Sequence, residues 1–176
     1  MLRWPSPKKA ISVDATGYSI LRIAEARKKQ QRELRASLYF FKEEVFIISA
    51  IAGTVEQGSP ATLESSATDE RLGSVVCDML VAYQNQSPKD LSDYTLKDWA
   101  AYEASGAKSA RAFENNSIFV CFETINTTIN ITARPRTTNH PELCAIVSTL
   151  AKHQDVGAGV RKAIHAAQAL RAAGLV

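Results

Sequence analysis

The stretch Ala67-Thr-Asp-Glu-Arg-Leu-Gly-Ser-Val-Val-Cys-Asp-Met-Leu-Val-Ala-Tyr83 carries the clearest structural signal in the chain. Its apolar side chains recur every three or four residues, which is the period of one buried face of an α-helix. They are Leu72, Val75, Val76, Met79, Leu80 and Tyr83. Thr68 stands at the position of a helix N-cap, and Asp69 and Glu70 fall in the first turn, where free backbone N–H groups favour acids. The stretch predicts a helix with one buried face.

A weaker copy of this pattern lies 84 residues further on, where the apolar positions from Val156 to Ala167 align with those of the first helix. Gly73 and Gly157 coincide in this alignment. A glycine inside a helix costs roughly 1 kcal/mol relative to alanine. A glycine at the same point of both helices predicts the close approach of another backbone, although so few identities also arise by chance.

The composition is that of one soluble globular domain. The chain has 176 residues, of which 45% are hydrophobic and 22% are charged. The longest apolar run, Val45 to Ala52, is much shorter than the ~20 residues of a membrane-spanning helix. No apolar segment of a signal peptide follows the basic first residues, so we expect a cytoplasmic protein. Residues 1–10 are expected to be a flexible leader, and residues 11–176 a single domain.

The local patterns predict an α/β fold of the α+β type, in which a mostly antiparallel sheet is packed by helices. The expected helices are 67–83, 96–103, 107–114, 155–173 and an N-terminal helix over 18–38. The expected strands are 39–41, 45–52 and a hairpin over 118–134, with a weak strand at 11–14. Residues 144–150 fit a strand or a helix, 134–141 a loop, and Gln57 to Pro60 a break that ends the second strand.

The reactive side chains give no sign of catalysis. Cys77, Cys121 and Cys144 form no Cys-x-x-Cys pair, so we expect them to be reduced and buried. Glycine-rich phosphate loops and a Gly-x-Ser-x-Gly motif are absent from the sequence. We therefore expect no enzyme, no cofactor and no metal. His140, His153 and His165 are expected at the surface or at helix ends, and a nucleophilic cysteine, Cys121 or Cys144, paired with His140 is a remote alternative.

The charges are unevenly distributed although the net charge is only +3. Basic residues crowd the N-terminal part, where Arg27, Lys28, Arg32 and Arg35 could contact nucleic acid or simply form a solvated helix face. Residues 69–103 are rich in acids, which could face a basic partner or be ordinary surface charges. These residues alone do not decide between the alternatives.

Several segments together resemble the immunity proteins of bacterial contact-dependent growth inhibition systems. The resemblance covers roughly residues 39–170 and lies in short motifs: Val45-Phe-Ile-Ile-Ser-Ala with Gly58-Ser-Pro-Ala61, the Asp69-Glu-Arg-Leu-Gly helix start, Trp99 to Phe113, the hairpin Ile118 to Arg134, and the Val156-Gly157 helix. Residues 16–38 do not fit the pattern.

The resemblance implies a small non-catalytic protein that binds and neutralises the C-terminal toxin domain, commonly a nuclease, of a surface effector. A nuclease groove is basic and attracts acids. We therefore expect toxin contacts at Asp78, Asp90, Asp93, Asp98, Tyr102 and Glu103, with Arg27, Lys28, Arg32 and Arg35 as the alternative contact. A nucleic-acid-binding regulator that uses these basic residues is the competing hypothesis. The oligomeric state is left open.

Overall fold

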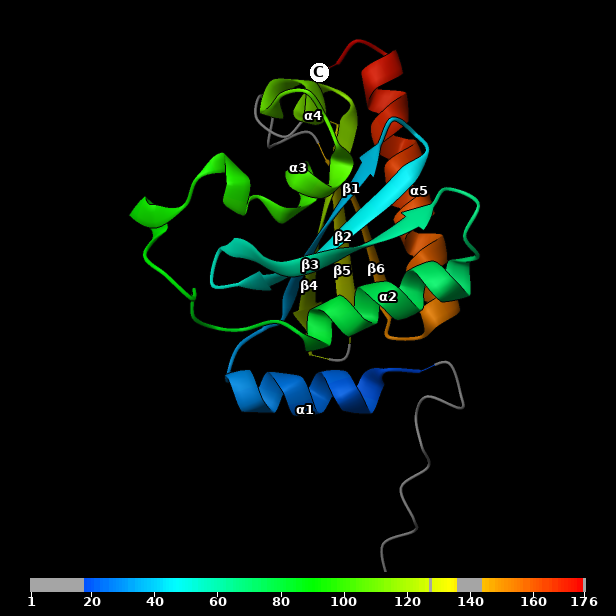
Figure 1. The fold of residues 1–176 in the computed structure, drawn as a ribbon. Coiled ribbons are helices and arrows are strands. Elements are labelled where there is room, and N and C mark those ends of the chain that lie inside the picture. The colour runs from blue at the N-terminus through cyan, green and yellow to red at the C-terminus, as the bar shows by residue number, and fades with distance from the viewer. Residues whose placement is uncertain (1–17, 127, 136–143, 176) are drawn as a thin grey trace, which may run out of the picture.

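A six-stranded sheet lies at the centre of the molecule, and each pair of neighbouring strands is antiparallel (Figure 1). The computed structural model describes residues 18–126, 128–135 and 144–175. The strand order is β3-β2-β1-β4-β5-β6. The strands are β1 (Arg35–Phe41), β2 (Val45–Ala52), β3 (Val55–Glu64), β4 (Ser117–Ile125), β5 (Thr128–Arg134) and β6 (Ala145–Leu150). The fold is thus a single α+β domain, as the sequence predicted.

Five α-helices and two 3-10 turns accompany the sheet in the described residues. They are α1 (Ile20–Gln30), α2 (Asp69–Val81), η2 (Leu91–Asp93), η3 (Leu96–Asp98), α3 (Ala100–Ser105), α4 (Ala110–Asn115) and α5 (His153–Ala172). None of these helices is both long enough and apolar enough to cross a membrane. The expected helices at 67–83, 107–114 and 155–173 are confirmed with ends that differ by a few residues, whereas the expected helix 96–103 is divided at Trp99 into η3 and the short helix α3.

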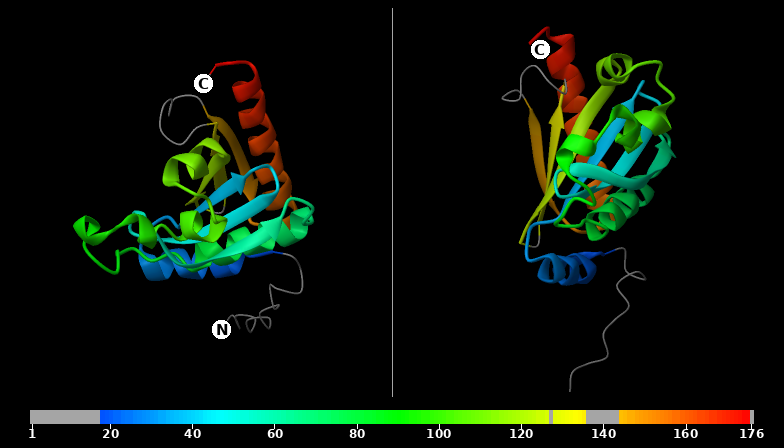
Figure 2. Two further views of the ribbon diagram at one scale, coloured as in Figure 1. Left: turned by 45° about the horizontal axis from the view of Figure 1, so that its top comes forward. Right: turned by 60° about the vertical axis from the view of Figure 1, so that its left-hand side comes forward.

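Helices α2 and α5 cover one face of the sheet and form the main core with it (Figure 2). Every second strand residue points into this core because side chains alternate between the two faces of a strand. Leu38, Val120 and Ile131 contribute from the strands, and Leu72 and Val160 from the helices, all with no exposed surface. Each fully buried side chain of this size stabilises the fold by roughly 1.5–3 kcal/mol.

The two glycines mark the crossing point of α2 and α5, which confirms the predicted close approach. A Cβ atom on Gly73 would lie 1.9 Å from the carbonyl oxygen of His153, and one on Gly157 would lie 2.0 Å from that of Asp69. Arg161 of α5 connects this helix to the start of α2 through hydrogen bonds. Its guanidinium donates to the Asp69 carboxylate at 2.7 Å and to the carbonyl oxygens of Ser65 and Ala67. The Thr68 hydroxyl accepts from the backbone N–H of Arg71, as expected of an N-cap.

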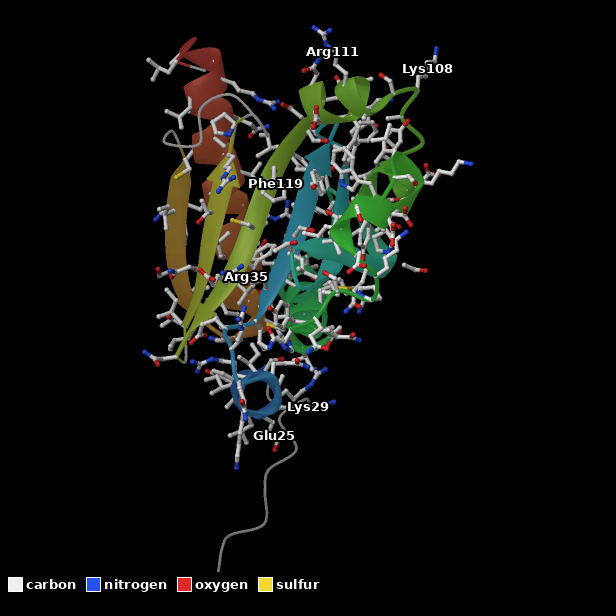
Figure 3. All side chains as sticks on the ribbon, turned by 90° about the vertical axis from the view of Figure 1, so that its left-hand side faces the viewer. Glu25, Lys29, Arg35, Lys108, Arg111 and Phe119 are labelled. Atoms are coloured by element: carbon white, nitrogen blue, oxygen red, sulfur yellow. The ribbon has the colours of Figure 1, made fainter. Side chains whose placement is uncertain are left out.

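The opposite face of the sheet is covered only in part. Helices α3 and α4 pack on β1 and β2 there, around Tyr39, Phe41 and Phe113. Figure 3 looks onto the part that they leave open, where Phe119 of β4 and Arg35 of β1 are labelled. Further along, the side chains of Ile146 and Leu150 on β6 are 64% and 50% exposed.

Helix α1 lies across one end of the sheet, and its extent corrects one prediction. The helix ends at Gln30, so the expected helix over 18–38 is wrong in its last part, where Arg35 to Leu38 belong to β1. These residues favour helix locally, but pairing with β2 and β4 outweighs that preference. His153 is the first residue of α5, as expected of a histidine at a helix end, but it is buried, and its Nε2 lies 2.7 Å from the Ser19 hydroxyl at the start of α1.

Strand β3 is not predicted by the sequence pattern, because Gly58 and Pro60 indicate a break after the second strand. Both residues are tolerated because β3 is an edge strand, which needs backbone hydrogen bonds on one side only. The cysteines also differ from expectation: all three are free, but only Cys77 is buried, while Cys121 and Cys144 are partly exposed. The predicted leader 1–10, the strand 11–14, His140 and most of the loop 134–141 lie outside the described residues.

Candidate protein-interaction site

Residues 86–98 form an arm that projects from the body of the molecule (Figures 1 and 2). Its start is fixed to β2, because the Gln84 N–H donates to the Ile51 carbonyl at 2.9 Å and the Gly53 N–H donates to the Gln84 carbonyl at 2.8 Å. Its tip presents apolar surface to solvent, since Leu91 is 61% exposed and Leu96 is 59% exposed. Two large exposed apolar side chains on a projecting segment are typical of a contact surface.

A cleft separates this arm from the sheet. Tyr94, Thr95 and Asp98 line it from the arm, and Trp99 lines it directly after the arm. The opposite side is formed by the sheet and the turn between β2 and β3, through Ser37, Tyr39, Ile51, Thr54, Val55, Glu56 and Phe119. Its volume of about 300 Å³ is at the lower end of the range of roughly 300–1,000 Å³ for small-ligand sites. The cleft therefore has room for a side chain or a short peptide turn. Four of its eleven lining residues are aromatic, and two carry carboxylates.

Glu56 ties the floor of the cleft to the arm. Its carboxylate accepts hydrogen bonds from the Ser37 hydroxyl at 2.9 Å, the Ser49 hydroxyl at 3.2 Å and the backbone N–H of Ala101 at 3.0 Å. These donors belong to β1, β2 and the first turn of α3. A carboxylate at a helix start also favours the positive end of the helix dipole. Glu56 thereby fixes where α3, and the arm before it, leave the sheet.

The aromatic wall is a continuous cluster rather than a set of isolated rings. The Tyr39 ring lies 5.9 Å from that of Trp99 and 5.1 Å from that of Phe119, and Trp99 packs edge-on against Phe113 at 5.1 Å. Burial raises the pKa of the Tyr39 hydroxyl, and the nearby Glu56 carboxylate raises it further. Tyr39 therefore stays neutral, and the cleft keeps a rigid wall.

Asp98 and Lys89 stabilise the arm internally. The Lys89 ammonium lies 2.7 Å from the Asp98 carboxylate and 4.6 Å from the centre of the Tyr94 ring. The same carboxylate accepts from the Thr95 N–H at 2.8 Å and from its hydroxyl at 2.9 Å, which forms a capping box on η3. The hydrogen bond from Lys89, followed by those from Thr95, lowers the pKa of Asp98 to about 2.

The structure brings most of the predicted toxin contacts onto the arm and the adjoining helix. Asp90 and Asp93 flank and close η2, and Asp98 ends η3. Tyr102 and Glu103 follow on α3, where the Tyr102 ring packs against Trp99 and Glu103 is exposed. Asp78 is separate from this group, because it lies on α2 and pairs with Arg22 of α1 at 2.8 Å.

The predicted basic cluster does not form one helix face. Lys28 and Arg32 are exposed near the end of α1, whereas Arg27 is bound to the Glu33 carboxylate and to the Asn126 carbonyl. Arg35 lies on β1 and pairs with Glu123 of β4 at 2.7 Å. Because two of the four charges are already paired with carboxylates, the structure does not favour the nucleic-acid alternative.

The sequence interpretation missed Glu56, Tyr94 and the cleft itself. A single acid close after the apolar run 45–52 is the only signal for Glu56 in the sequence, and its partners come from residues 7 to 45 positions away along the chain. In the described residues, no three His, Cys, Asp or Glu side chains come close enough together to hold a metal ion.

No protein-family model and no curated protein matches the sequence significantly, but solved structures with a similar fold are known. A protein of unknown function from Neisseria meningitidis has a similar structure, with a TM-score of 0.58 and 18% identity over 77% of this chain and 96% of that one. A chain of the CdiA-CT/CdiI toxin and immunity complex from Yersinia pseudotuberculosis is also similar, with a TM-score of 0.57 and 16% identity over 77% of this chain and 97% of the other. The fold of this chain is therefore shared with proteins from two bacteria.

Proposed function

We propose that this chain is an immunity protein, which binds and neutralises the C-terminal toxin domain of a cognate contact-dependent growth inhibition effector. The single observation that carries the proposal is the similarity of its fold to a chain of a toxin and immunity complex. The short motifs between residues 39 and 170 support it independently, because they resemble this class of protein in sequence.

The arm and the cleft together provide the proposed contact surface. Stable interfaces bury about 800 Å² on each partner, with an apolar centre and a polar rim. Leu91 and Leu96 supply exposed apolar groups, and Asp90, Asp93 and Glu103 supply acids around them. This surface is complementary to a basic groove such as that of a nuclease, whose substrate carries a negative charge at every phosphate.

The proposed inhibition needs binding alone. A protein that covers a nucleic-acid groove excludes the substrate without performing any chemistry, provided that its own surface is rigid. The arm meets this requirement, because its backbone is held in place by Glu56, by the Lys89–Asp98 pair and by the capping box at Thr95. Rigid surfaces lose less conformational entropy on binding and so bind more tightly.

Co-expression with a candidate toxin domain, sought in the gene immediately upstream, tests the proposal. The wild-type chain should protect the cells and should co-elute with the toxin domain in gel filtration. Leu91→Asp and Leu96→Asp should weaken the complex, since each places a charge in the apolar centre of the proposed interface. Ile146→Asp is the matched control, because Ile146 is equally exposed at 64% but lies on β6.

The outcomes test the proposed function and the proposed contact surface separately. Failure of the wild-type chain to protect or to co-elute would contradict the proposed function. A complex that survives both leucine changes but is lost with Ile146→Asp would contradict the assignment of the interface to the arm.

A further inference from the structure

We propose that the cleft between the arm and the sheet receives an arginine side chain of the partner. This inference rests on the proposed function and deepens it, because it names the chemical group that the cleft recognises. It is carried by the charge, the aromatic walls and the cation contacts of the cleft.

The charge of the cleft is negative. Glu56 and Asp98 bring two carboxylates to its lining, and no Lys, Arg or His stands among its described lining residues. Lys89 reaches Asp98 from outside this lining and balances one of the charges. The Glu56 carboxylate is bound by hydroxyl and N–H groups, which are neutral donors. A cation that enters the cleft would therefore approach the Glu56 carboxylate, whose negative charge is not neutralised by any described side chain of the lining.

Two aromatic rings of the lining already hold cations of this chain. The Lys89 ammonium lies 4.6 Å from the centre of the Tyr94 ring, and the Arg134 guanidinium lies 5.9 Å from that of Phe119. A cation within about 6 Å of a ring centre is attracted by the negative face of the ring. These two rings of the cleft wall therefore pack against an ammonium and a guanidinium group of residues that lie outside the lining.

Tyr94 adds a polar atom that is left without a partner. Its hydroxyl oxygen is buried and makes no hydrogen bond among the described residues. Buried hydroxyls are usually paired, so an unpaired one next to a cleft needs an explanation. A guanidinium between Tyr94 and Asp98 would donate to both, because it carries enough N–H groups to bind the Tyr94 hydroxyl oxygen and the Asp98 carboxylate at the same time.

The geometry favours arginine over lysine. A guanidinium is flat, stacks on aromatic faces and binds a carboxylate with two parallel N–H groups. The cleft offers aromatic faces from Tyr39, Trp99 and Phe119 in a volume of about 300 Å³. An ammonium would bind Asp98 as a point charge, as Lys89 does, and would leave most of this aromatic surface without contact.

The test uses blocked arginine, N-acetyl-arginine amide, as a probe of the full-length wild-type chain. Its neutral analogue, N-acetyl-citrulline amide, has nearly the same shape and is the matched control. NMR spectroscopy follows the indole N–H of Trp99, which Trp4→Phe distinguishes from the second tryptophan. We expect saturable shifts with blocked arginine and binding at least about tenfold weaker with citrulline, as for the loss of a charged hydrogen bond.

Three variants make the test specific to the proposed contacts. Asp98→Asn and Tyr94→Phe should each weaken probe binding several-fold. Lys89→Met should strengthen it, because it removes the ammonium that competes for Asp98. Because Lys89 also helps to hold the arm, the spectrum of Lys89→Met without probe must first show that the arm keeps its structure. Equal binding of arginine and citrulline, absence of Trp99 shifts, or weaker binding by Lys89→Met would overturn the inference.

The toxin experiment distinguishes this inference from the proposed function. A chain that neutralises the toxin but does not bind blocked arginine overturns the arginine site alone. A chain that binds the probe but neutralises no toxin overturns the proposed function alone.

Discussion

Replacement of Gly157 by alanine tests the contact on which the main core depends. A Cβ atom at this position would lie 2.0 Å from the carbonyl oxygen, 2.5 Å from the carbonyl carbon and 2.6 Å from the Cα of Asp69. Ordinary contacts of a Cβ atom begin near 3.4 Å. All three atoms belong to the backbone, so no side-chain rotation relieves the clash. Helices α2 and α5 must move apart by more than about 1 Å, since 3.4 Å minus 2.0 Å is 1.4 Å.

Two opposing effects set the magnitude. Overpacking a close-packed core costs about 1–3 kcal/mol, and the rigidity of the atoms involved places Gly157→Ala at the upper end. The higher helix propensity of alanine returns about 1 kcal/mol. We therefore expect the free energy of unfolding to fall by about 2 kcal/mol, which corresponds to a Tm lower by roughly 4–8 °C in a domain of this size.

Gly159→Ala is the matched control in the same helix. Its Cβ atom would lie 2.9 Å from the Cδ1 of Ile131, the end of a side chain that can rotate away. The gain in helix propensity should roughly cancel the repacking, so we expect a change within about 1 kcal/mol. Urea denaturation followed by circular dichroism at 222 nm measures both variants. Equal effects at the two glycines, or a fully stable Gly157→Ala, would refute the interpretation of the helix crossing.

Three further predictions follow from the local contacts. Thr68→Ala removes the acceptor of the Arg71 N–H and should lower the free energy of unfolding by about 1 kcal/mol in urea denaturation, whereas Thr68→Ser should not. In an NMR titration the Asp98 carboxyl, whose pKa is lowered to about 2 chiefly by the hydrogen bond from Lys89, should remain ionised well below its usual value of 3.8. Because the folded-state pKa of Asp98 is depressed, the ion pair with Lys89 stabilises the fold above about pH 4, and this contribution is lost as the pH falls towards 2. Lys89→Met should return the pKa of Asp98 towards its usual value. Burial raises the pKa of the Cys77 thiol to about 12, so Cys77 should react with Ellman's reagent at pH 8 only as the protein unfolds; fast reaction of this thiol in the folded chain would contradict its burial.

Sequence patterns predicted the elements whose signal is local. Helix α2 was predicted from its apolar period and its N-cap, and the paired glycines predicted the close approach of two backbones. The hairpin of β4 and β5 was predicted from its alternation. In each case, the residues that determine the structure lie within one element or in two similar ones.

The features that were missed depend on distant partners. Residues 35–38 favour helix by composition, but β2 and β4 pair with them on either side. Gly58 and Pro60 interrupt most strands, yet they occur in β3 because it lies at the edge of the sheet. The cleft combines residues of four strands with the arm, and its key acid, Glu56, is held by donors from β1, β2 and α3. No pattern along the chain encodes that combination.

The central claim of the account is that this chain binds a toxin domain through its arm. Isothermal titration of the purified full-length chain with a purified candidate toxin domain from the gene upstream measures it most directly, with Leu91→Asp beside the wild type and Ile146→Asp as control. We predict a saturable complex of defined stoichiometry for the wild type and for Ile146→Asp, and binding weakened at least about tenfold for Leu91→Asp. No heat of binding for the wild-type chain at micromolar concentrations, in two buffers of different ionisation enthalpy, would contradict the claim.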